Sequence, residues 1–322
     1  MNILDKELRK FCVAPMMGYT TQHARNLYRI LSKKAYLFSE MITCKTLIHS
    51  KKTDYFLENK NQNPVALQVG GCDIEDLIKC CKLAAKHKFN EINLNLGCPS
   101  KAVQNGKFGA CLMKNKDLVL DCLKSMKDSA DIEVSFKCRL GVDSFDSYDF
   151  FSDFIGTTTS SGVNIVYVHA RKAILKGLNP KKNRSVPPLN YKYVSKIKKD
   201  FPQINFILNG GIKNLEEAKT LSNSFDGVMI GRLIQTDPFC LSNVDNMFFD
   251  HQKNTINLNN IVSEYFLYIK KQLKNESIYK LLSPLMGVFF AKPFGKKIKS
   301  EIHNAIKDNK IDQLEKFILN SI

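Results

Sequence analysis

The sequence lacks any apolar run that approaches the roughly 20 residues needed to cross a membrane. Its first residues, MNILDKELRKF, contain neither a long apolar stretch nor the small-residue cleavage site of a signal peptide. We therefore expect a cytoplasmic protein with no membrane partner. Hydrophobic residues make up 44% of the 322 residues, which is enough to build a full core, so extensive disorder is not expected.

Cysteine pairs of the CxxC type are also absent, although the chain contains ten cysteines. Zinc and iron–sulfur sites commonly use such pairs, so we expect no metal centre. A disulfide framework is not expected either, because the chain is long and carries no secretory signal. Several cysteines lie inside apolar runs, where a free thiol packs as a small hydrophobic group.

A third missing feature is a GxGxxG turn after the first apolar run, which argues against an open, doubly wound nucleotide-binding sheet. Eight apolar runs alternate with helical patterns instead. They cover residues 11–15, 36–41, 64–70, 91–97, 133–139, 164–170, 204–210 and 227–232. Their number and nearly continuous apolar character predict an α/β fold, the (β/α)8 TIM barrel, and the open sheet remains the weaker alternative.

Two of the intervening helices have clear start signals. Apolar residues recur at helical spacing over 74–88, and Asp73 is placed to cap that helix. Asn214 is placed to cap a helix over 215–221, whose first turn carries two glutamates, as the helix dipole favours.

The pattern changes after Pro238. Residues 243–260 are polar and rich in asparagine, and we interpret them as a linker. From residue 261 onward only helical spacing is found, which predicts a small all-helical C-terminal domain over 261–322. The barrel would then occupy residues 1–242.

Polar side chains collect where the central strands are expected to end, which is where TIM barrels carry their chemistry. These residues are Gln68, Asn93, Asn95, Lys137, Arg139 and His169. Two amides two residues apart share one face of a strand, and an apolar core rarely tolerates them. Buried lysine and arginine are similarly rare unless paired, so the pair in the fifth strand favours an anion or an electron-rich ring. His169 fits a ligand contact and a structural role equally well.

The last two strands end in glycines, Asn209-Gly210-Gly211 and Gly231-Arg232. Glycine backbones can approach a phosphate closely, and this part of the fold is its usual phosphate site. The first strand ends in Ala14-Pro15-Met16, where the proline either admits a flat ligand or simply stops the strand. A phosphate beside a polar ring fits flavin mononucleotide (FMN) best.

Cys98 follows the fourth strand in Gly97-Cys98-Pro99, and the next segment contains Gly106 and Gly109. A free thiol is mostly protonated at neutral pH, so Cys98 could act as a general acid, and the segment behind it could act as a lid. The alternative is a buried structural cysteine. A substrate that needs a hydride and a proton has an activated carbon–carbon double bond, such as C5–C6 of uracil.

The chain is strongly basic, with 48 lysines and arginines against 31 acidic residues and a net charge of +17. An anionic partner and simple compositional bias both explain this number. Clustering favours the partner, because residues 171–199 contain no acidic side chain. The basic residues there are Arg171, Lys172, Lys176, Lys181, Lys182, Arg184, Lys192, Lys196, Lys198 and Lys199. A second cluster, Lys292, Lys296, Lys297 and Lys299, fits RNA binding and a solvated helix face equally.

Several motifs together resemble the tRNA-dihydrouridine synthase family, specifically its A-type subfamily. They are NLNLGCPS, SEM, ALQVGG, FKCRLG, VHARKAILKGLNPKKNR, NGGI and GVMIGR, spread from residue 11 to residue 232. The resemblance implies an FMN-containing barrel that uses NADPH to reduce uridine to 5,6-dihydrouridine at positions 20 and 20a of the tRNA D-loop. No obligatory protein partner is expected.

The resemblance also implies roles for individual residues. FMN contacts are expected at Ala14, Pro15, Met16, Gln68, Lys137, His169, Asn209, Gly210, Gly211, Gly231 and Arg232. FMN N5 would give a hydride to uracil C6, and Cys98 would protonate C5. Contacts to tRNA are expected at Asn95, Arg139, Lys181, Arg184, Lys296 and Lys299. The family usually has arginine at the last two positions, and lysine cannot form the same bidentate contact.

Two other functions are compatible with parts of this pattern. A small-molecule FMN enzyme would share the barrel and the flavin, but the acid-free basic segment argues against it. An RNA-binding protein without catalysis would share the basic segment, but Cys98, Lys137 and His169 argue against that.

Overall fold

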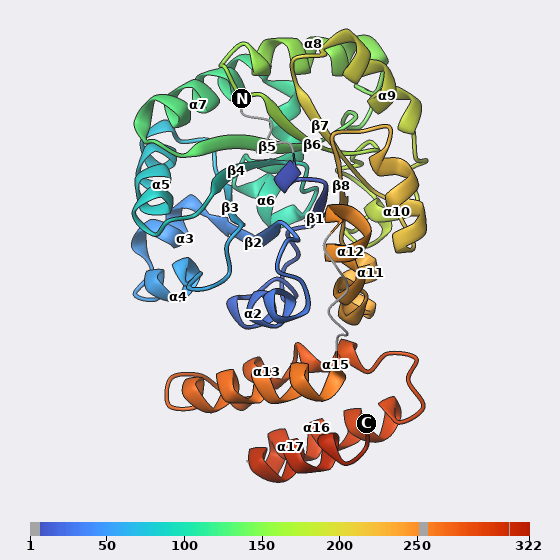
Figure 1. Ribbon diagram of the computed structural model, residues 1–322. Coiled ribbons are helices and arrows are strands. Elements are labelled where there is room, and N and C mark those ends of the chain that lie inside the picture. Colours follow the sequence, from blue (N-terminus) through green and yellow to red (C-terminus); the bar gives the residue numbers. More distant parts are fainter. Residues whose placement is uncertain (1–6, 251–256, 309) are drawn as a thin grey trace.

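A computed structural model describes residues 7–250, 257–308 and 310–322, and its central feature is a sheet of eight parallel strands (Figure 1). The strand order is β1-β8-β7-β6-β5-β4-β3-β2. The sheet closes between its first and last members, because Val13 N donates to Tyr36 O at 2.8 Å and Tyr36 N donates to Phe11 O at 2.9 Å. The strands are β1 (Phe11–Val13), β2 (Leu37–Thr43), β3 (Val65–Gly70), β4 (Glu91–Leu96), β5 (Glu133–Arg139), β6 (Ile165–His169), β7 (Asn205–Asn209) and β8 (Gly227–Ile230). The predicted TIM barrel is confirmed.

The strands alternate between two cores, as a period of two requires. Residues such as Ile92, Leu94 and Val134 face outward and join the large core between barrel and helices. Residues on the other face fill the barrel interior: Cys12, Ala14, Tyr36, Phe38, Ala66, Ile165, Tyr167, Ile207 and Met229. Burial on both faces explains why most of the runs are apolar almost throughout.

Helices and short 3₁₀ turns connect the strands. They are α2 (Gln22–Leu31), α3 (Cys44–His49), α4 (Thr53–Leu57), α5 (Ile74–Lys86), α6 (Lys101–Asn105), η1 (Gly109–Lys114), α7 (Lys116–Ser129), α8 (Tyr148–Thr159), η2 (Lys182–Arg184), α9 (Tyr191–Asp200), α10 (Leu215–Ser222), α11 (Arg232–Thr236) and η3 (Pro238–Asn243). Both predicted caps are confirmed. The Asp73 carboxylate accepts the N–H of Asp76 at 3.0 Å, and the Asn214 side chain accepts the N–H of Glu217 at 2.8 Å.

The expected linker over 243–260 is partly helical. Helix α12 (Val244–Phe249) packs on the barrel, where Phe248 lies 4.9 Å from Phe11 between ring centroids. The Asp245 carboxylate binds the turn after α2, accepting the N–H of Lys33 at 2.7 Å. Residues 251–256 lie outside the described residues, and α13 begins at Leu258. Asparagine content therefore did not distinguish a linker from a short docked helix.

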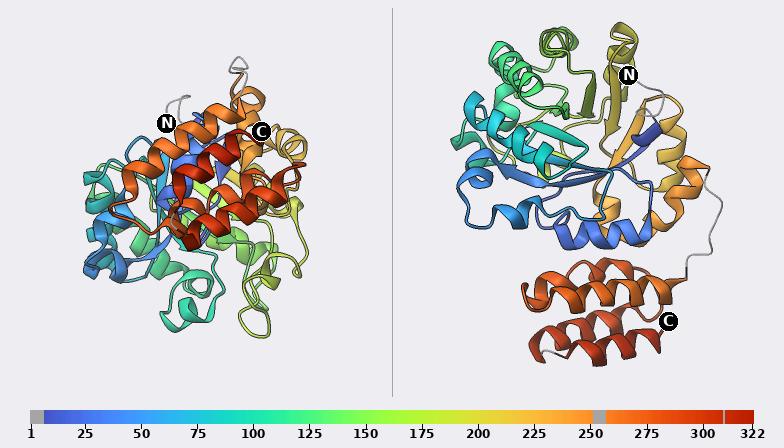
Figure 2. Two further views of the ribbon diagram at one scale, coloured as in Figure 1. Left: turned by 90° about the horizontal axis from the view of Figure 1, so that it is seen from below. Right: turned by 60° about the vertical axis from the view of Figure 1, so that its left-hand side comes forward.

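The C-terminal helices form the expected small bundle, which lies against the barrel near α2 (Figure 2). They are α13 (Leu258–Gln272), α14 (Ile278–Leu282), α15 (Leu285–Val288), α16 (Gly295–Asp308) and α17 (Ile311–Leu319). The seam between bundle and barrel is buried. His23 Nδ1 and the Tyr268 hydroxyl are 2.7 Å apart, the Tyr265 hydroxyl donates to His23 O at 3.4 Å, and one continuous apolar core spans both parts.

In the described part of the chain, no helix combines the length and the apolar character that crossing a bilayer requires. Over the same residues, no three His, Cys, Asp or Glu side chains cluster as metal ligands would.

Candidate functional site at the barrel mouth

The carboxyl ends of the central strands bring the sequence-predicted polar residues together. Asn95 pairs in register with Lys137, Arg139 pairs with His169, and His169 pairs with Asn209. Because residues in register on neighbouring strands point the same way, these side chains form one ring at the mouth of the barrel. The site thus lies where parallel barrels place their chemistry.

The turn after β7 is shaped for close approach of a ligand. Gly210 and Gly211 have positive φ values of 112° and 80°, which favour glycine. A Cβ on Gly210 would lie 2.6 Å from the His169 ring, so a side chain has no room there. The Asn209 amide donates to Met229 O at 2.7 Å, and this bond joins the ends of β7 and β8.

The turn after β8 also contains a glycine, Gly231, but its φ is negative, at -117°. A Cβ on Gly231 would lie 3.3 Å from the sulfur of Met16, so the end of β1 and the end of β8 meet there. Ala14 is buried and Pro15 and Met16 are half-buried, whereas Arg232 is exposed at the start of α11. The three predicted glycine-containing and proline-containing turns therefore border one region.

Arg171 is a site residue that the sequence reasoning missed, because it was counted with the basic segment. Its side chain is only 8% exposed, and its Nε has no hydrogen-bond partner among the described residues. Its Nη1 donates to Ser185 O at 3.2 Å and to Pro187 O. The preceding residue is fixed next to the β7 turn, since Ala170 N donates to Asn209 O at 2.9 Å. No local pattern separates Arg171 from its basic neighbours, because it lies just beyond the end of β6, where the chain turns and Arg171 N donates to His169 O at 2.6 Å.

Positive charge dominates the mouth. Burial and the neighbouring Arg139 lower the pKa of Lys137 to about 7. Burial also lowers the pKa of His169 well below its usual value, and Arg139, Lys137, Arg171 and Arg232 add to that effect. His169 is therefore neutral at physiological pH. A buried donor without a partner, two glycine turns and this cluster of cations fit a bound phosphate group.

The amides on the facing strands bind one another. The Asn95 amide nitrogen donates to Gln68 Oε1 at 2.9 Å, and the Gln68 amide nitrogen donates to Asn93 Oδ1 at 2.8 Å. These contacts satisfy groups that would be costly to bury alone. Contacts of Gln68 with FMN and of Asn95 with tRNA stay predictions.

Cys98 is half-buried at the mouth, and its main chain is held on both sides. Its N–H donates to Asn95 Oδ1 at 3.0 Å, and its carbonyl accepts the N–H of Ala110 at 3.0 Å. The thiol lies 3.5 Å from the Ser100 hydroxyl. The segment behind it, expected as a lid, forms the short helix α6, and Gln104 ties that helix to Leu175 O at 3.1 Å.

Arg139 connects the thiol turn to the basic segment. It is 3% exposed, and its guanidinium donates to Gly97 O at 3.2 Å, to Asn183 O at 2.9 Å and to Lys172 O at 3.3 Å. Burial lowers the pKa of Arg139 to about 10, so it remains charged at neutral pH. The structure gives Arg139 this bridging position, and its contact with tRNA stays a prediction.

The remaining predicted tRNA contacts lie on two surfaces. Lys181 and Arg184 are exposed around η2, which is anchored by the buried Asn183 through its bond to Ile174 O at 2.8 Å. Lys296 is exposed and Lys299 half-buried on α16 of the C-terminal bundle.

Comparison with known proteins gives a consistent result. The family model for dihydrouridine synthase (Dus) matches residues 12–318. The tRNA-dihydrouridine(20/20a) synthase of Yersinia pestis is 44% identical over 88% of this chain and 82% of its own length. The proteins of the same name from Vibrio vulnificus (strain CMCP6) and Escherichia coli (strain K12) are both 42% identical, over 91% and 93% of this chain and 90% and 88% of their own lengths.

Among solved structures, the histamine dehydrogenase from Rhizobium sp. 4-9 superposes with a TM-score of 0.53 at 12% identity. The match covers 79% of this chain and 48% of that chain. At this identity the likeness concerns the barrel fold alone.

Proposed function

Because this chain belongs to the dihydrouridine synthase family, we propose that it reduces uridine to 5,6-dihydrouridine in tRNA, at positions 20 and 20a of the D-loop. The observation that carries the proposal is the family match over residues 12–318, together with a half-buried thiol at the mouth of a cationic barrel. The relatives' names supply the two positions.

The residues at the mouth fit FMN. The glycine turns at Gly210-Gly211 and Gly231 and the unpartnered Nε of Arg171 would hold its phosphate. Lys137, His169 and Gln68 would face the ring system, and a cation there favours an electron-rich ring. When bound and reduced by NADPH, FMN would supply the hydride for uracil C6.

Cys98 would supply the matching proton. Reduction of the C5=C6 bond adds a hydride at C6 and a proton at C5, and the thiol proton of Cys98 would go to C5 and leave a thiolate. Arg139 donates to the carbonyl of Gly97, next to Cys98, at 3.2 Å, so its positive charge would lie near the thiolate until solvent reprotonates it.

Two basic surfaces would bind the RNA. Lys181 and Arg184 border the mouth, and Lys296 and Lys299 lie on the bundle, so we propose that residues 261–322 form a tRNA-binding domain beside a catalytic barrel over 1–242. The target base must leave its stack to reach a site inside the barrel mouth. We expect the reaction to take place in the cytoplasm, where its substrate is found.

The direct test is chemical mapping of dihydrouridine. Purified protein loaded with FMN should convert uridines 20 and 20a of unmodified tRNA in the presence of NADPH, and a reaction without NADPH is the control. The protein should also be yellow as isolated. A folded, FMN-loaded protein that leaves both uridines unchanged would contradict the proposed function.

Arg184→Ala should weaken tRNA binding and reduce its salt dependence. Loss of one phosphate contact should lower the slope of log K against log salt by about 0.7–0.9. Binding measured between low and moderate salt checks this result. Lys82→Ala on the exposed face of α5 is the matched control and should leave the slope unchanged. Equal slopes for the wild type, Arg184→Ala and Lys82→Ala would show that the η2 region does not contact the RNA.

A further inference from the structure

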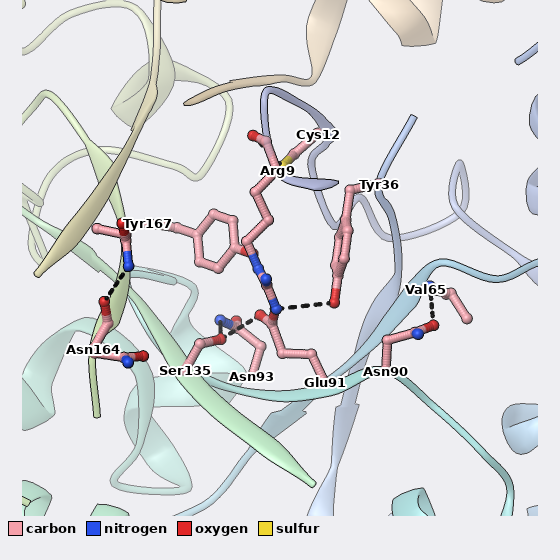
Figure 3. A network of polar contacts seen from close by, with 11 residues as sticks. Arg9, Cys12, Tyr36, Val65, Asn90, Glu91, Asn93, Ser135, Asn164 and Tyr167 are labelled. Carbon is pink, nitrogen blue, oxygen red and sulfur yellow. Dashed lines mark hydrogen bonds and ion pairs between the residues drawn. The ribbon is translucent and has the colours of Figure 1, made fainter. Parts of the chain in front are cut away.

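A line of polar side chains crosses the barrel interior from its base to Cys98. Figure 3 shows its lower part, where Glu91 is fully buried at the start of β4. Arg9 donates to Glu91 Oε2 from Nε at 2.9 Å and from Nη2 at 2.6 Å, and the Tyr167 hydroxyl donates to the same oxygen at 3.1 Å. The other carboxylate oxygen, Oε1, accepts the hydroxyl of Ser135.

From Ser135 the line continues upward through amides. The Asn93 nitrogen donates to Ser135 Oγ at 2.6 Å, and the Gln68 nitrogen donates to Asn93 Oδ1 at 2.8 Å. The Asn95 nitrogen donates to Gln68 Oε1 at 2.9 Å. Asn95 Oδ1 then accepts the N–H of Gly97 at 3.2 Å and of Cys98 at 3.0 Å.

The direction of every bond in this line is determined at both ends. An ionised carboxylate only accepts hydrogen bonds, so Ser135 must donate to Glu91 and must accept from the nitrogen of Asn93. Each following amide is then oriented by the one below it. At the top, a main-chain N–H only donates, so Asn95 must present its oxygen to Cys98. The two ends require the same orientation of all three amides.

We propose that Ser135 and Asn93 are positioning residues for the turn that carries Cys98. Glu91 fixes the direction of its hydrogen bond with Ser135, and each later bond, through Asn93 and Gln68 to Asn95, takes its direction from the one before it. Asn95 then holds the main chain of Gly97 and Cys98. The importance of this positioning for catalysis rests on the proposed function of Cys98. Neither residue reaches the mouth, since both belong to the middle of the barrel and are fully buried.

A purely structural role would not require polar groups at these places. Across the same interior, Ala66, Ile207 and Met229 fill the space with apolar side chains. Apolar packing is at least as stable as a buried polar line and needs no partners. A fully paired polar line does provide one thing that apolar packing lacks, namely a single orientation for the amides at its end.

Ser135→Ala tests the proposal, because it removes the hydroxyl that orients Asn93 and leaves the volume nearly unchanged. Hydrogen–deuterium exchange of the Gly97 and Cys98 amides should accelerate roughly five- to tenfold, as expected for one weakened hydrogen bond. Single-turnover oxidation of the reduced enzyme by tRNA should slow roughly 10- to 100-fold through misplacement of the thiol. FMN content should match the wild type, because the groups proposed to hold its phosphate, Gly210-Gly211, Gly231 and Arg171, do not belong to this line.

Ser39→Ala is the matched control. Ser39 is also a buried strand serine, but it accepts the main-chain N–H of Gln68 at 2.9 Å and does not touch its amide. It should leave exchange at Gly97 and Cys98 unchanged. Ser135→Thr keeps the hydroxyl and should restore both the exchange and the single-turnover rate.

Unchanged exchange at Gly97 and Cys98 in Ser135→Ala, or an equal change in Ser39→Ala, would overturn the proposal. The exchange measurement does not depend on the reaction. If wild-type protein failed to reduce tRNA, the proposed function would fail while the exchange data still decided whether the buried line holds the turn.

Discussion

Replacing Cys98 by alanine should abolish most uridine reduction while leaving flavin reduction by NADPH intact. The half-buried thiol is the proposed proton source, and loss of a general acid typically slows a reaction by a factor of about 10²–10⁴. The two half-reactions are measured separately, by the bleaching of the flavin absorbance with NADPH and by its return when tRNA is added.

Cys111→Ala is the control for this variant. Cys111 is another half-buried thiol in the segment that follows Cys98, and its sulfur donates to Phe108 O at 3.0 Å. It should leave both half-reactions unchanged. Normal turnover of tRNA by Cys98→Ala would show that another group protonates C5.

Arg9→Met should produce the largest loss of stability in the barrel. The change leaves the carboxylate of Glu91 fully buried without its cation, and breaking such a pair typically costs about 3–5 kcal/mol. Burial alone would lower the pKa of Arg9, but the neighbouring Glu91 carboxylate raises it well above its usual value, so Arg9 stays charged at neutral pH. The midpoint of urea unfolding, followed by circular dichroism, measures the loss.

Lys116→Met is the matched surface control. Lys116 lies 2.6 Å from a carboxylate oxygen of Asp153, but both side chains are exposed. Solvent screens such pairs, so the free energy of unfolding should change by no more than about 1 kcal/mol. Similar unfolding midpoints for the two variants would mean that the buried pair contributes no more than a surface pair.

The fold was predictable from the sequence because its signals are local. Each strand is a short apolar run, and each predicted cap, such as Asp73 or Asn214, acts within three residues. The ring of residues at the mouth was predictable for a related reason. In a parallel barrel all strand ends meet, so position along a strand already gives position in the site.

The buried polar contacts inside the barrel, the burial of Arg171 and the docking of α12 could not be predicted, because they depend on contacts that no local pattern reveals. Arg9 and Glu91 are 82 positions apart, and Ser135 is 44 positions from Glu91. Glu91 could be recognised as the start of a strand, but its partners could not. Arg171 was assigned to the RNA surface because its neighbours are basic, and only its burial separates it from them. The expected linker over 243–260 contains α12, and its contacts with the barrel, such as that of Phe248 with Phe11, are not visible in the local sequence.

The buried seam at His23, Tyr265 and Tyr268 has a consequence for how a large substrate would be accommodated. A hinge needs an interface that separates easily, whereas here one continuous core runs through both parts of the molecule. The two proposed RNA-binding surfaces, one on the barrel and one on the bundle, are thus held at a fixed separation. If the protein binds tRNA as proposed, the RNA and not a closing motion between the two parts would have to adapt its shape.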